Sequence, residues 1–457
     1  MKIFNSQTGK KEKLVPLDGK QVRMYICGMT VYDDTHIGHA RTFLCFDLIV
    51  RYLRNAGYKV NYIRNITDVD DKIIARAKDL NAEATELTDK YIASMQEDFN
   101  DLGMISPDLE PRATDNIESI ISLIEGLIGK GHAYIGNKDV YFSTDSFKEY
   151  GQLSNINTED LIAGARIDVD EEKKNPVDFV LWKQAEEGLA WDSPWGRGRP
   201  GWHIECSAMS MDALGNNFDI HGGGIDLKFP HHENEIAQSV CATGEKFAKC
   251  WMHTGPLRID KEKMSKSLDN FITIKEALKE FPSEVIRFFL ISNHYRSPLN
   301  YSKEGVLEAK SALDRLYTSL IDLDLRKEKH SNDADLISPF KEAMEDDFNV
   351  PSALAALFEI VKSINLAKEN GNIKEANVLG ATLVHLSEPL GILQQKTEDY
   401  FQIGATLSNE EIQSMIHERN QAREDEDFEL SDKIRDSLLE KGIVLEDTDK
   451  GTTWKVQ

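Results

Sequence analysis

The hydrophobic pattern near the start of the chain changes from the period of a strand to that of a helix. Residues 22–26 form a short apolar run that predicts a buried strand, and a polar turn follows it. From His36 the apolar positions recur at helical spacing, and Asn55 and Gly57 end the predicted helix. The apolar positions of this helix are Ile37, Ala40, Leu44, Leu48 and Tyr52.

A second strand and helix follow directly. Residues 58–66 predict the strand, and residues 68–80 predict a helix whose N-terminal aspartates suit the positive end of the helix dipole. A strand, a helix and a strand in this order indicate a parallel sheet with right-handed crossovers. Two amphipathic helices come next, and we interpret their apolar stripes as core. The stripes are Tyr91, Met95, Phe99 and Leu102, and then Ile117, Ile121, Ile124 and Ile128.

The pattern then changes to short strands. Residues 133–135 and 139–142 flank a glycine–asparagine pair, which is a hairpin signal. The charged segment that continues to residue 195 predicts an insertion that splits the sheet. Residues 218–220 resume the pattern of a parallel strand, ahead of a glycine-rich turn at 221–227.

Beyond residue 274 the chain is predicted to be almost wholly helical as far as residue 390. Long amphipathic stretches predict a helical bundle, which a linker separates from a small last unit with one charged helix and one strand. The ranges are 306–320 and 352–366 for the amphipathic stretches, 395–408 for the linker, 410–441 for the charged helix and 443–445 for the strand.

Composition narrows the class of protein. The chain has 457 residues, enough for several domains, and 40% of them are hydrophobic, enough for real cores. The formal net charge of −24 argues against indiscriminate coating of nucleic acid, although a local basic face can still bind RNA. Five widely spread cysteines suit a reducing compartment better than a disulfide framework. Because the chain shows no apolar leader and no membrane-spanning run, we expect a cytoplasmic protein that does not bind a membrane.

The first candidate site is the turn that opens the helix at residue 36. The letters HIGH at residues 36–39 place two histidines around a glycine in the first helical turn. Unpaired N–H groups and the helix dipole favour phosphate there, and Gly38 permits a close approach. We expect Thr35 or Asp34 to cap the helix. Taken alone, the pattern also fits an ordinary strand–helix turn with solvated histidines.

The second candidate site is a lysine-rich loop far downstream. Lys263 and Lys266 stand among small hydroxyl residues in the sequence KMSKS, residues 263–267. A charged run of this kind, taken alone, is usually a solvated loop. Histidines at a helix N-terminus and a lysine loop can, however, take the two sides of a triphosphate and stabilise the charge that develops during its reaction.

A third pattern indicates a metal site. His231 and Glu235 are four residues apart, so they share one face of a helix and could form half of a zinc site. Most such pairs are surface charge partners. Cys27 and Cys206 are candidates to complete the site, although no sequence spacing links four ligands this dispersed.

The motifs HIGH and KMSKS, in that order, resemble the signature of the class I aminoacyl-tRNA synthetases. Three segments narrow the resemblance to the cysteinyl-tRNA synthetase family, and it extends nearly end to end through NITDVDDKI, HYRSPLNYS and LEDTDKGTTW. The three segments are YICGMTVYD at 25–33, GWHIECSAMS at 201–210 and FPHHENEIAQS at 229–239.

The resemblance implies an α/β fold. It consists of a class I Rossmann-like catalytic domain with a parallel sheet, split by an insertion and followed by an α-helical bundle and a small C-terminal mixed α/β unit. The bundle and the last unit would reach the anticodon stem and loop. The ranges are 1–114 and 200–245 for the two catalytic halves, 115–199 for the connective insertion, 246–303 for the KMSKS loop and stem-contact region, 304–400 for the bundle and 401–457 for the anticodon-binding unit.

The resemblance also implies an activity, its partners and its residues. It implies ATP-dependent charging of tRNA(Cys) with L-cysteine. Mg²⁺ would accompany the ATP. We expect the protein to be a monomer. In the family, one zinc ion per chain binds the substrate thiolate. The matching zinc ligands are Cys27, Cys206, His231 and Glu235, and the catalytic residues are His36, His39, Lys263 and Lys266. The residues that match ATP-binding positions are Thr35, His36, Gly38, His39, Gly223, Asp226 and Lys266, with His221 and Gly222 in the same glycine-rich turn. The residues that match cysteine-binding positions are Thr67, Trp202 and Asp226, and those in anticodon-reading stretches are Arg423, Asp432 and Asp447.

Several alternatives remain open at this stage. Asp226 could bind either the ribose hydroxyls or the substrate ammonium. A cysteine ligase that uses an amino-sugar acceptor would share the same motifs but would not need the C-terminal unit. A methionine-specific enzyme is disfavoured because no Cys-x-x-Cys knuckle occurs, and a non-catalytic relative is disfavoured because the signature residues are present. Asp269 stands where the family commonly has glycine, and Lys261 is a milder departure of the same kind.

Overall fold

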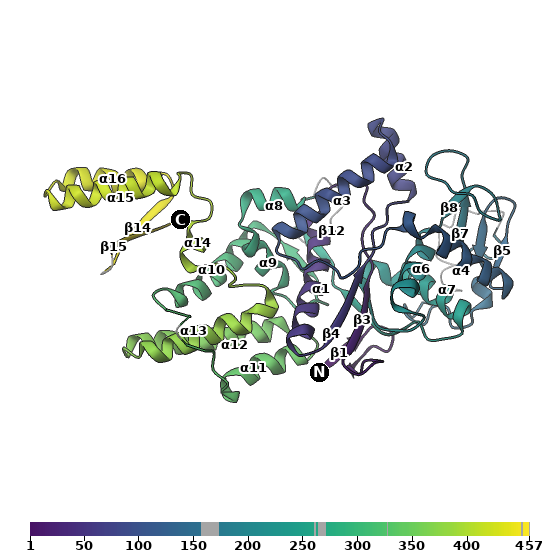
Figure 1. The fold of residues 1–457 in the computed structure, drawn as a ribbon, viewed down its shortest axis with the longest axis horizontal. Helices are drawn as coiled ribbons and strands as arrows, with labels where there is room; N and C mark the ends of the chain where they lie inside the picture. Colours follow the sequence, from purple (N-terminus) through teal and green to yellow (C-terminus); the bar gives the residue numbers. More distant parts are fainter. Residues whose placement is uncertain (157–172, 260–261, 264–270, 327, 449–450, 457) are drawn as a thin grey trace.

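A parallel sheet of four strands lies at the centre of the molecule (Figure 1). The computed structural model describes residues 1–156, 173–259, 262–263, 271–326, 328–448 and 451–456. The strand order is β10-β9-β3-β4, and each neighbouring pair is parallel. The strands are β3 (Gln21–Ile26), β4 (Lys59–Arg64), β9 (Phe218–Gly224) and β10 (Ala248–Thr254). Because β10 belongs to this sheet, the predicted catalytic boundary at residue 245 lies one strand too early.

The sheet separates two hydrophobic cores. Successive side chains of a strand point to opposite faces, so Met24 and Ile26 join the core that contains α1 (Ile37–Asn55), whereas Tyr25 and Cys27 join the core on the other face. Helix α1 lies between the sheet and α9 (Ser283–Ile291), which explains why it is buried on most of its circumference. The second core is covered by α4 (Ile117–Gly129), α6 (Trp202–Leu214) and α7 (Glu233–Thr243).

The helices after β4 follow the predicted order with small differences. Helix α2 (Asp71–Leu80) begins three residues after residue 68, because the Asp70 side chain caps it by accepting a hydrogen bond from the Lys72 amide. The apolar stripe of α3 (Ala84–Asp101) is buried as predicted. In α4 the predicted stripe is confirmed at Ile117 and Ile124. At the other two positions the helix buries Ile120 and Leu127, and Ile121 and Ile128 are only half-buried.

The insertion is a separate antiparallel sheet of order β5-β6-β7-β8. The predicted hairpin is confirmed as its first two strands, and Trp182 fills the space beneath the sheet. The strands are β5 (Ala133–Ile135), β6 (Val140–Phe142), β7 (Phe179–Gln184) and β8 (Gly198–Pro200).

Two small sheets flank the central one. β1 (Lys2–Asn5) and β2 (Lys10–Lys13) form an N-terminal hairpin. β11 (Leu257–Ile259) pairs with β12 (Glu262–Lys263) and, in parallel, with β13 (Leu299–Tyr301). The expectation of an almost wholly helical segment after residue 274 is therefore wrong at β13, where pairing with a distant strand decides the conformation.

The helical bundle follows. Helix α12 is long and apolar enough to cross a membrane by length and composition, but it packs against α11 and α13 as a core helix of the bundle. The helices of this region are α8 (Ile274–Glu280), α10 (Lys303–Leu320), α11 (Ala334–Glu345), α12 (Val350–Glu369), α13 (Ile373–Ser387) and α14 (Thr397–Gln402).

The last unit stands apart from the rest (Figure 1). Two helices pack on a two-stranded antiparallel sheet around a small core that includes Ile412, Leu438 and Trp454. The prediction of one helix over 410–441 is wrong, because Glu426 adopts a left-handed conformation (φ 60°) and Asp427 caps a second helix. The elements are α15 (Asn409–Glu424), α16 (Phe428–Glu440), β14 (Ile443–Thr448) and β15 (Gly451–Val456).

One buried arginine in α9 connects helix α1, the turn after α3 and the end of the helical bundle. Arg287 of α9 is 2% exposed and forms an ion pair with Asp47 of α1. It also donates to the carbonyl of Leu390, at 2.9 Å, and to that of Gly103, at 3.2 Å. Because removal of one partner leaves the other charge buried, such a pair is sensitive to substitution.

We expect Arg287→Met to lower the free energy of unfolding by about 3–5 kcal/mol, because the Asp47 carboxylate then stays buried without its cation. Urea denaturation followed by circular dichroism measures the change. Arg326→Met, at an arginine whose side chain is 96% exposed, is the control and should leave the transition unchanged. If both variants had the same free energy of unfolding, the stabilising role of the Arg287–Asp47 pair would be contradicted.

Candidate active site and metal centre

The candidate site lies where the carboxyl ends of the central strands meet. Cys27 follows β3 directly, and its amide donates to the carbonyl of Gly222 in β9 at 2.9 Å. The Gly28 amide donates to Asn65 after β4 at 2.8 Å, and a Cβ at Gly28 would lie 1.7 Å from the Asn65 carbonyl oxygen. Only glycine allows this approach, which brings the segments after β3 and β4 together at the edge where α/β sheets bind ligands.

In the HIGH turn (residues 34–39), two histidines cap the N-terminus of α1 by accepting hydrogen bonds from each other's backbone amides. His36 is the N-cap of α1: its Nδ1 accepts from the His39 amide at 3.2 Å, and the His39 Nδ1 accepts from the His36 amide at 3.4 Å. The two rings stack with centroids 3.5 Å apart. Because both Nδ1 atoms accept, each neutral ring carries its proton on Nε2. The Gly38 amide has no acceptor in the described part of the chain, as phosphate binding requires.

The predicted cap of this helix is wrong. Neither Thr35 nor Asp34 caps α1, because the His36 ring takes that place. Thr35 is 1% exposed and donates its hydroxyl proton to Asp98 of α3. Asp34 accepts a hydrogen bond from Ser94 of the same helix at 3.0 Å.

The chain that follows the second signature motif contacts the first motif through backbone hydrogen bonds. Lys263 ends β12, whereas Lys266 and Asp269 lie outside the described residues. The chain after them returns to the HIGH turn: the Ile37 amide donates to the Ile272 carbonyl at 3.1 Å, and the Ile274 amide donates to the Thr35 carbonyl at 3.0 Å. The segment at residues 272–274, downstream of KMSKS, is therefore held directly against the turn that carries the two histidines.

Four dispersed residues converge in one buried group, the metal cluster (Cys27, Cys206, His231 and Glu235), as predicted for the zinc ligands. Their ligand atoms all lie within 4.8 Å of one another. The Cys27 sulfur is 3.5 Å from a Glu235 oxygen, and the His231 Nε2 is 3.2 Å from the same oxygen. A tetrahedral zinc site requires about 3.5 Å between sulfur and oxygen and about 3.3 Å between nitrogen and oxygen. The donor set and its spacing thus fit a divalent metal ion.

The electrostatics of the metal cluster also favour a cation. Burial raises the pKa of the Cys27 thiol and of the Glu235 carboxyl well above their usual ranges. Burial lowers the pKa of His231 well below its usual range, which leaves the imidazole neutral, the form that binds metals. Thiols and a carboxyl buried together are unfavourable as anions, and a bound divalent cation would compensate for that charge.

A second, overlapping group of donors consists of Cys27, His221, His232 and Glu235. In it the His221 Nε2 lies 2.8 Å from the second Glu235 oxygen. His221, which the resemblance placed with the adenosine-binding turn, is completely buried and points to Glu235 instead. Its contact orients the carboxylate that both groups share.

The residues around the metal cluster were not found from the sequence. The His203 Nδ1 lies 2.8 Å from the His231 Nδ1, and the His232 Nδ1 lies 2.9 Å from the His253 Nε2. Glu233 is completely buried and accepts hydrogen bonds from the amides of Gly151, Leu153 and Ser154 at 3.0, 3.1 and 2.8 Å. It therefore fixes the insertion to the start of α7, the helix that carries Glu235 and that directly follows the turn carrying His231. No periodic or spacing signal marks these residues as partners.

Of the residues expected to bind cysteine, Trp202 contacts the metal cluster directly. Trp202 is 39% exposed and its ring centroid lies 4.4 Å from that of His231, so it forms an open wall beside the group. Thr67 is 2% exposed and is fixed by backbone pairing with Met29 and Val31. Asp226, in a short 3₁₀ turn after β9, is exposed, and Gly223, near the end of β9, is buried.

The expected anticodon residues lie in the C-terminal unit. Asp447 accepts hydrogen bonds from Arg423, at 2.9 Å, and from both terminal nitrogens of Arg419, each at 2.9 Å. The Arg419 guanidinium is the main reason why the pKa of Asp447 lies well below its usual range. Asp432 is exposed on α16. Asp447 thus holds Arg423 in place, so its carboxylate is already engaged within the protein.

Comparisons with known proteins agree with this geometry. Residues 13–311 match the family described as tRNA synthetases class I (C) catalytic domain, and residues 339–394 match the DALR domain. The fold and the site define a class I aminoacyl-tRNA synthetase.

Within that class, the most similar relatives considered are proteins named "Cysteine--tRNA ligase". Those from Halorhodospira halophila and Shewanella sediminis are each 54% identical over 458 residues, covering 100% of this chain and 99% of theirs. The protein of the same name from Marinobacter nauticus is 52% identical over 459 residues, with the same coverage. The chain belongs to the cysteine–tRNA ligase family.

Solved structures of other class I enzymes share the fold. Methionyl-tRNA synthetase from Mycobacterium tuberculosis, in complex with methionyl-adenylate, has a TM-score of 0.60 at 15% identity and covers 81% of this chain and 89% of its own. A putative arginyl-tRNA synthetase from Campylobacter jejuni has a TM-score of 0.54 at 14% identity, with 82% and 94% covered. At these identities the likeness concerns the fold alone.

We expect Cys206→Ser to weaken binding of a divalent metal by more than about 100-fold, because one of four ligands loses its thiolate. Competition with a chromophoric chelator measures the affinity. Cys241→Ser, at another buried cysteine that lies outside both groups, should bind metal like the unaltered protein. If Cys206→Ser retained full affinity, the ion would instead be held by the overlapping group that contains His221 and His232.

Proposed function

We propose that the protein activates L-cysteine with ATP and transfers it to tRNA(Cys). The cysteine carboxylate attacks the α-phosphate of ATP and displaces pyrophosphate, which gives cysteinyl-adenylate. A hydroxyl of the 3′-terminal adenosine of the tRNA then attacks the activated carbonyl, and AMP leaves. The observation that carries the proposal is the buried two-cysteine metal cluster at the same sheet edge as the HIGH turn.

We further propose that the ion is zinc, one per chain, held by Cys27, Cys206, His231 and Glu235. When bound, zinc supplies a soft Lewis acid to which a thiolate binds much more strongly than a hydroxyl. A pocket that sensed only the size of the side chain would separate cysteine from serine by at most about 1–3 kcal/mol. Trp202, which contacts His231, would close one side of the amino-acid pocket, and the buried Thr67 would line another, so both would restrict how the amino acid can lie.

For the activation step we propose that ATP, with Mg²⁺, binds between the HIGH turn and the lysine segment. The Nε2–H groups of His36 and His39 and the Gly38 amide would donate to the phosphates. Lys266, and to a lesser degree Lys263, would approach from the other side. Donors arranged in advance around the α-phosphate stabilise the charge of the transition state without reorganisation. Gly223 and Asp226 would contact the adenosine end, or Asp226 the substrate ammonium.

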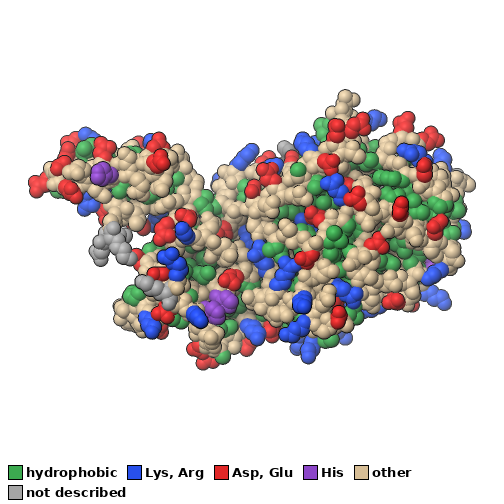
Figure 2. Space-filling model, in the orientation of Figure 1, with side chains coloured by type: hydrophobic (Ala, Val, Ile, Leu, Met, Phe, Trp, Pro, Cys, Tyr) green, Lys and Arg blue, Asp and Glu red, His purple; other side chains and the backbone are tan. Residues whose placement is uncertain are grey.

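For tRNA we propose that the bundle and the C-terminal unit contact the anticodon stem and loop. Although the net charge is −24, acidic and basic side chains are interspersed over the face in Figure 2, and Lys and Arg side chains gather in its lower middle. Such local basic areas bind RNA on an acidic protein. Arg423, held by Asp447, and Asp432 would meet the bases of the loop. We propose a cytoplasmic monomer.

The second candidate function is a cysteine ligase with an amino-sugar acceptor. Such an enzyme would share the metal cluster and both motifs but would have no use for the unit from α15 to β15. That unit has its own hydrophobic core and a fixed group of Arg419, Arg423 and Asp447, which favours the tRNA acceptor.

We expect the zinc-loaded protein to catalyse cysteine-dependent exchange of pyrophosphate into ATP and to charge purified tRNA(Cys). A chelator should abolish exchange, and serine should support neither reaction, because a hydroxyl lacks the affinity of a thiolate for zinc. Exchange without charging of tRNA, together with cysteine transfer to an amino sugar, would favour the second candidate. Exchange that depends on another amino acid would contradict the proposed specificity.

Lys266→Ala should slow pyrophosphate exchange by about 100-fold or more while metal content and affinity for cysteine stay unchanged, because the lysine acts on the developing phosphate charge. Stopped-flow and equilibrium measurements separate the rate from the affinity. Lys275→Ala is not a suitable control, since this lysine contacts α3, so Lys310→Ala on α10 serves instead. An unchanged rate in Lys266→Ala would remove Lys266 from the catalytic residues.

A further inference from the structure

Helix α3 supports the HIGH turn from behind. Asp98 of this helix is completely buried, and one of its oxygens accepts the hydrogen bond from the Thr35 hydroxyl. Its other oxygen has no hydrogen-bond partner among the residues that the structure describes. Burial raises the pKa of the Asp98 carboxyl, and the Thr35 hydroxyl opposes that effect. A buried carboxylate with a single donor is costly, so its presence at this position calls for a specific role.

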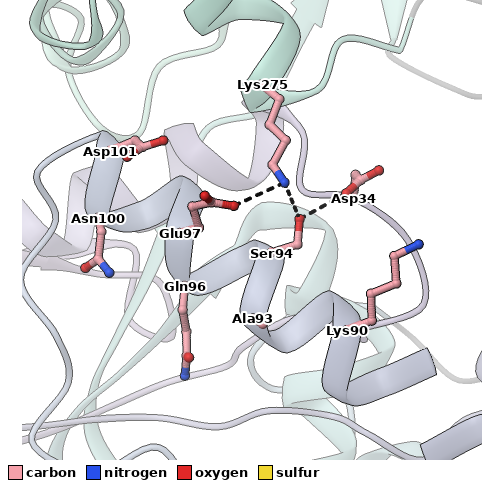
Figure 3. A pocket seen from close by; sticks show the side chains of 9 residues that line it. All are labelled: Asp34, Lys90, Ala93, Ser94, Gln96, Glu97, Asn100, Asp101 and Lys275. Carbon is pink, nitrogen blue, oxygen red and sulfur yellow. Dashed lines mark hydrogen bonds and ion pairs between the residues drawn. The ribbon is translucent and has the colours of Figure 1, made fainter. Parts of the chain in front are cut away.

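The preceding turn of α3 contacts residues that lie next to the two sequence motifs: Asp34, just before HIGH, and Lys275, eight residues after KMSKS. Ser94 donates to Asp34 at 3.0 Å and accepts from Lys275 at 3.0 Å, and Lys275 lies 3.5 Å from Glu97 (Figure 3). These side chains line an open groove of about 750 Å³. Since Lys275 lies in α8, just after the KMSKS segment, α3 holds the entry of the HIGH turn and the exit of the lysine segment on one rigid support.

Thr35 links this support to the two histidines. Its side chain is 1% exposed and donates its hydroxyl proton to Asp98, so the hydroxyl faces α3. The next residue is His36, whose extended backbone (φ −117°, ψ 165°) places its ring over the first turn of α1. Removing the acceptor for the Thr35 hydroxyl therefore removes one of the contacts that fix the backbone before the stacked rings of His36 and His39, and leaves the hydrogen bond from the Ile274 amide to the Thr35 carbonyl.

We propose that Asp98 is a positioning residue for adenylate formation: by fixing Thr35 it sets the placement of His36 and His39 against the ATP phosphates. This inference rests on the function proposed above. Asp98 needs only to accept a hydrogen bond from Thr35, so an amide oxygen in its place can do the same. Displacement of reacting groups by about 1 Å costs on the order of 100-fold in rate, which makes such indirect support measurable.

The test compares Asp98→Ala, Asp98→Asn, Thr35→Val and the double variant Asp98→Ala/Thr35→Val. Asp101→Ala, at an exposed aspartate of the same helix, is the matched control. We expect Asp98→Ala to lower kcat of cysteine-dependent pyrophosphate exchange by about 10- to 100-fold. The KM for cysteine and the metal content should not change. Asp98→Asn should recover most of kcat, and the double variant should be no slower than Thr35→Val, because both changes remove one interaction.

Two results would overturn the inference. One is an Asp98→Ala variant that melts at a lower temperature but keeps the kcat of the unaltered protein in its folded fraction, because a merely structural role predicts that pattern. The other is additive loss in the double variant.

Affinity for MgATP, measured by calorimetry without cysteine, separates this inference from the proposed function. Asp98→Ala should weaken MgATP binding by about tenfold, and Asp98→Asn should restore it, whichever amino acid the protein activates. If the unaltered protein bound MgATP but showed no cysteine-dependent exchange, the proposed specificity would fail, and the MgATP series would still decide the role of Asp98. Equal MgATP affinity in all variants would contradict that role.

Discussion

The buried group of Cys27, Cys206, His231 and Glu235 is the constraint on which the rest of the site depends. Its side chains are at most 3% exposed, and together they offer two sulfurs, a nitrogen and a carboxylate oxygen at the spacing of a tetrahedral ion. Without a cation, burial keeps the thiol and carboxyl protons in place. The end of β3, the helices α6 and α7 and the turn before α7 therefore meet at a centre in which a bound cation would stabilise the deprotonated thiols and carboxylate.

The same strand connects this centre to the phosphate side of the site. Cys27 leaves the end of β3, and the chain that follows it reaches the HIGH turn within ten residues. Because parallel strands carry their ligand-binding loops at one edge, the proposed amino-acid pocket over the metal cluster and the proposed ATP site over α1 would be neighbours. Precise placement then depends on supports outside the site, namely Glu233 beneath the insertion, Asp98 beneath Thr35 and Arg287 behind α1.

Local hydrophobic patterns predicted a helix or strand correctly where its conformation depends on the burial of one face of that segment. The strands at 22–26 and 58–66, the helix from residue 36 and the hairpin after residue 132 all follow from periodicity and turn residues. The errors occur where a contact with a segment distant in the sequence determines the local conformation. The strand at Leu299–Tyr301 exists because β11 lies beside it, and the predicted helix over 410–441 divides because α16 must fold back to bury Leu438 against α15. The cap of α1 was assigned to Thr35 or Asp34 because small polar residues usually cap helices, but both are engaged by α3.

The sequence by itself determined the strand–helix–strand order at the start of the chain, the hairpin after residue 132, the two signature motifs and the four candidate metal ligands, because residue types, local spacing and resemblance can be read along one chain. Only the tertiary structure decided which atoms meet. It placed His221 against Glu235 rather than toward a nucleotide, paired His203 with His231, and buried Thr35 on Asp98. Helical and strand periods report on neighbours a few positions apart, whereas Thr35 and Asp98 are separated by 63 positions and Cys27 and Glu235 by 208. Contacts at such separations arise from the packing of the sheet and its helices, and no local pattern encodes them.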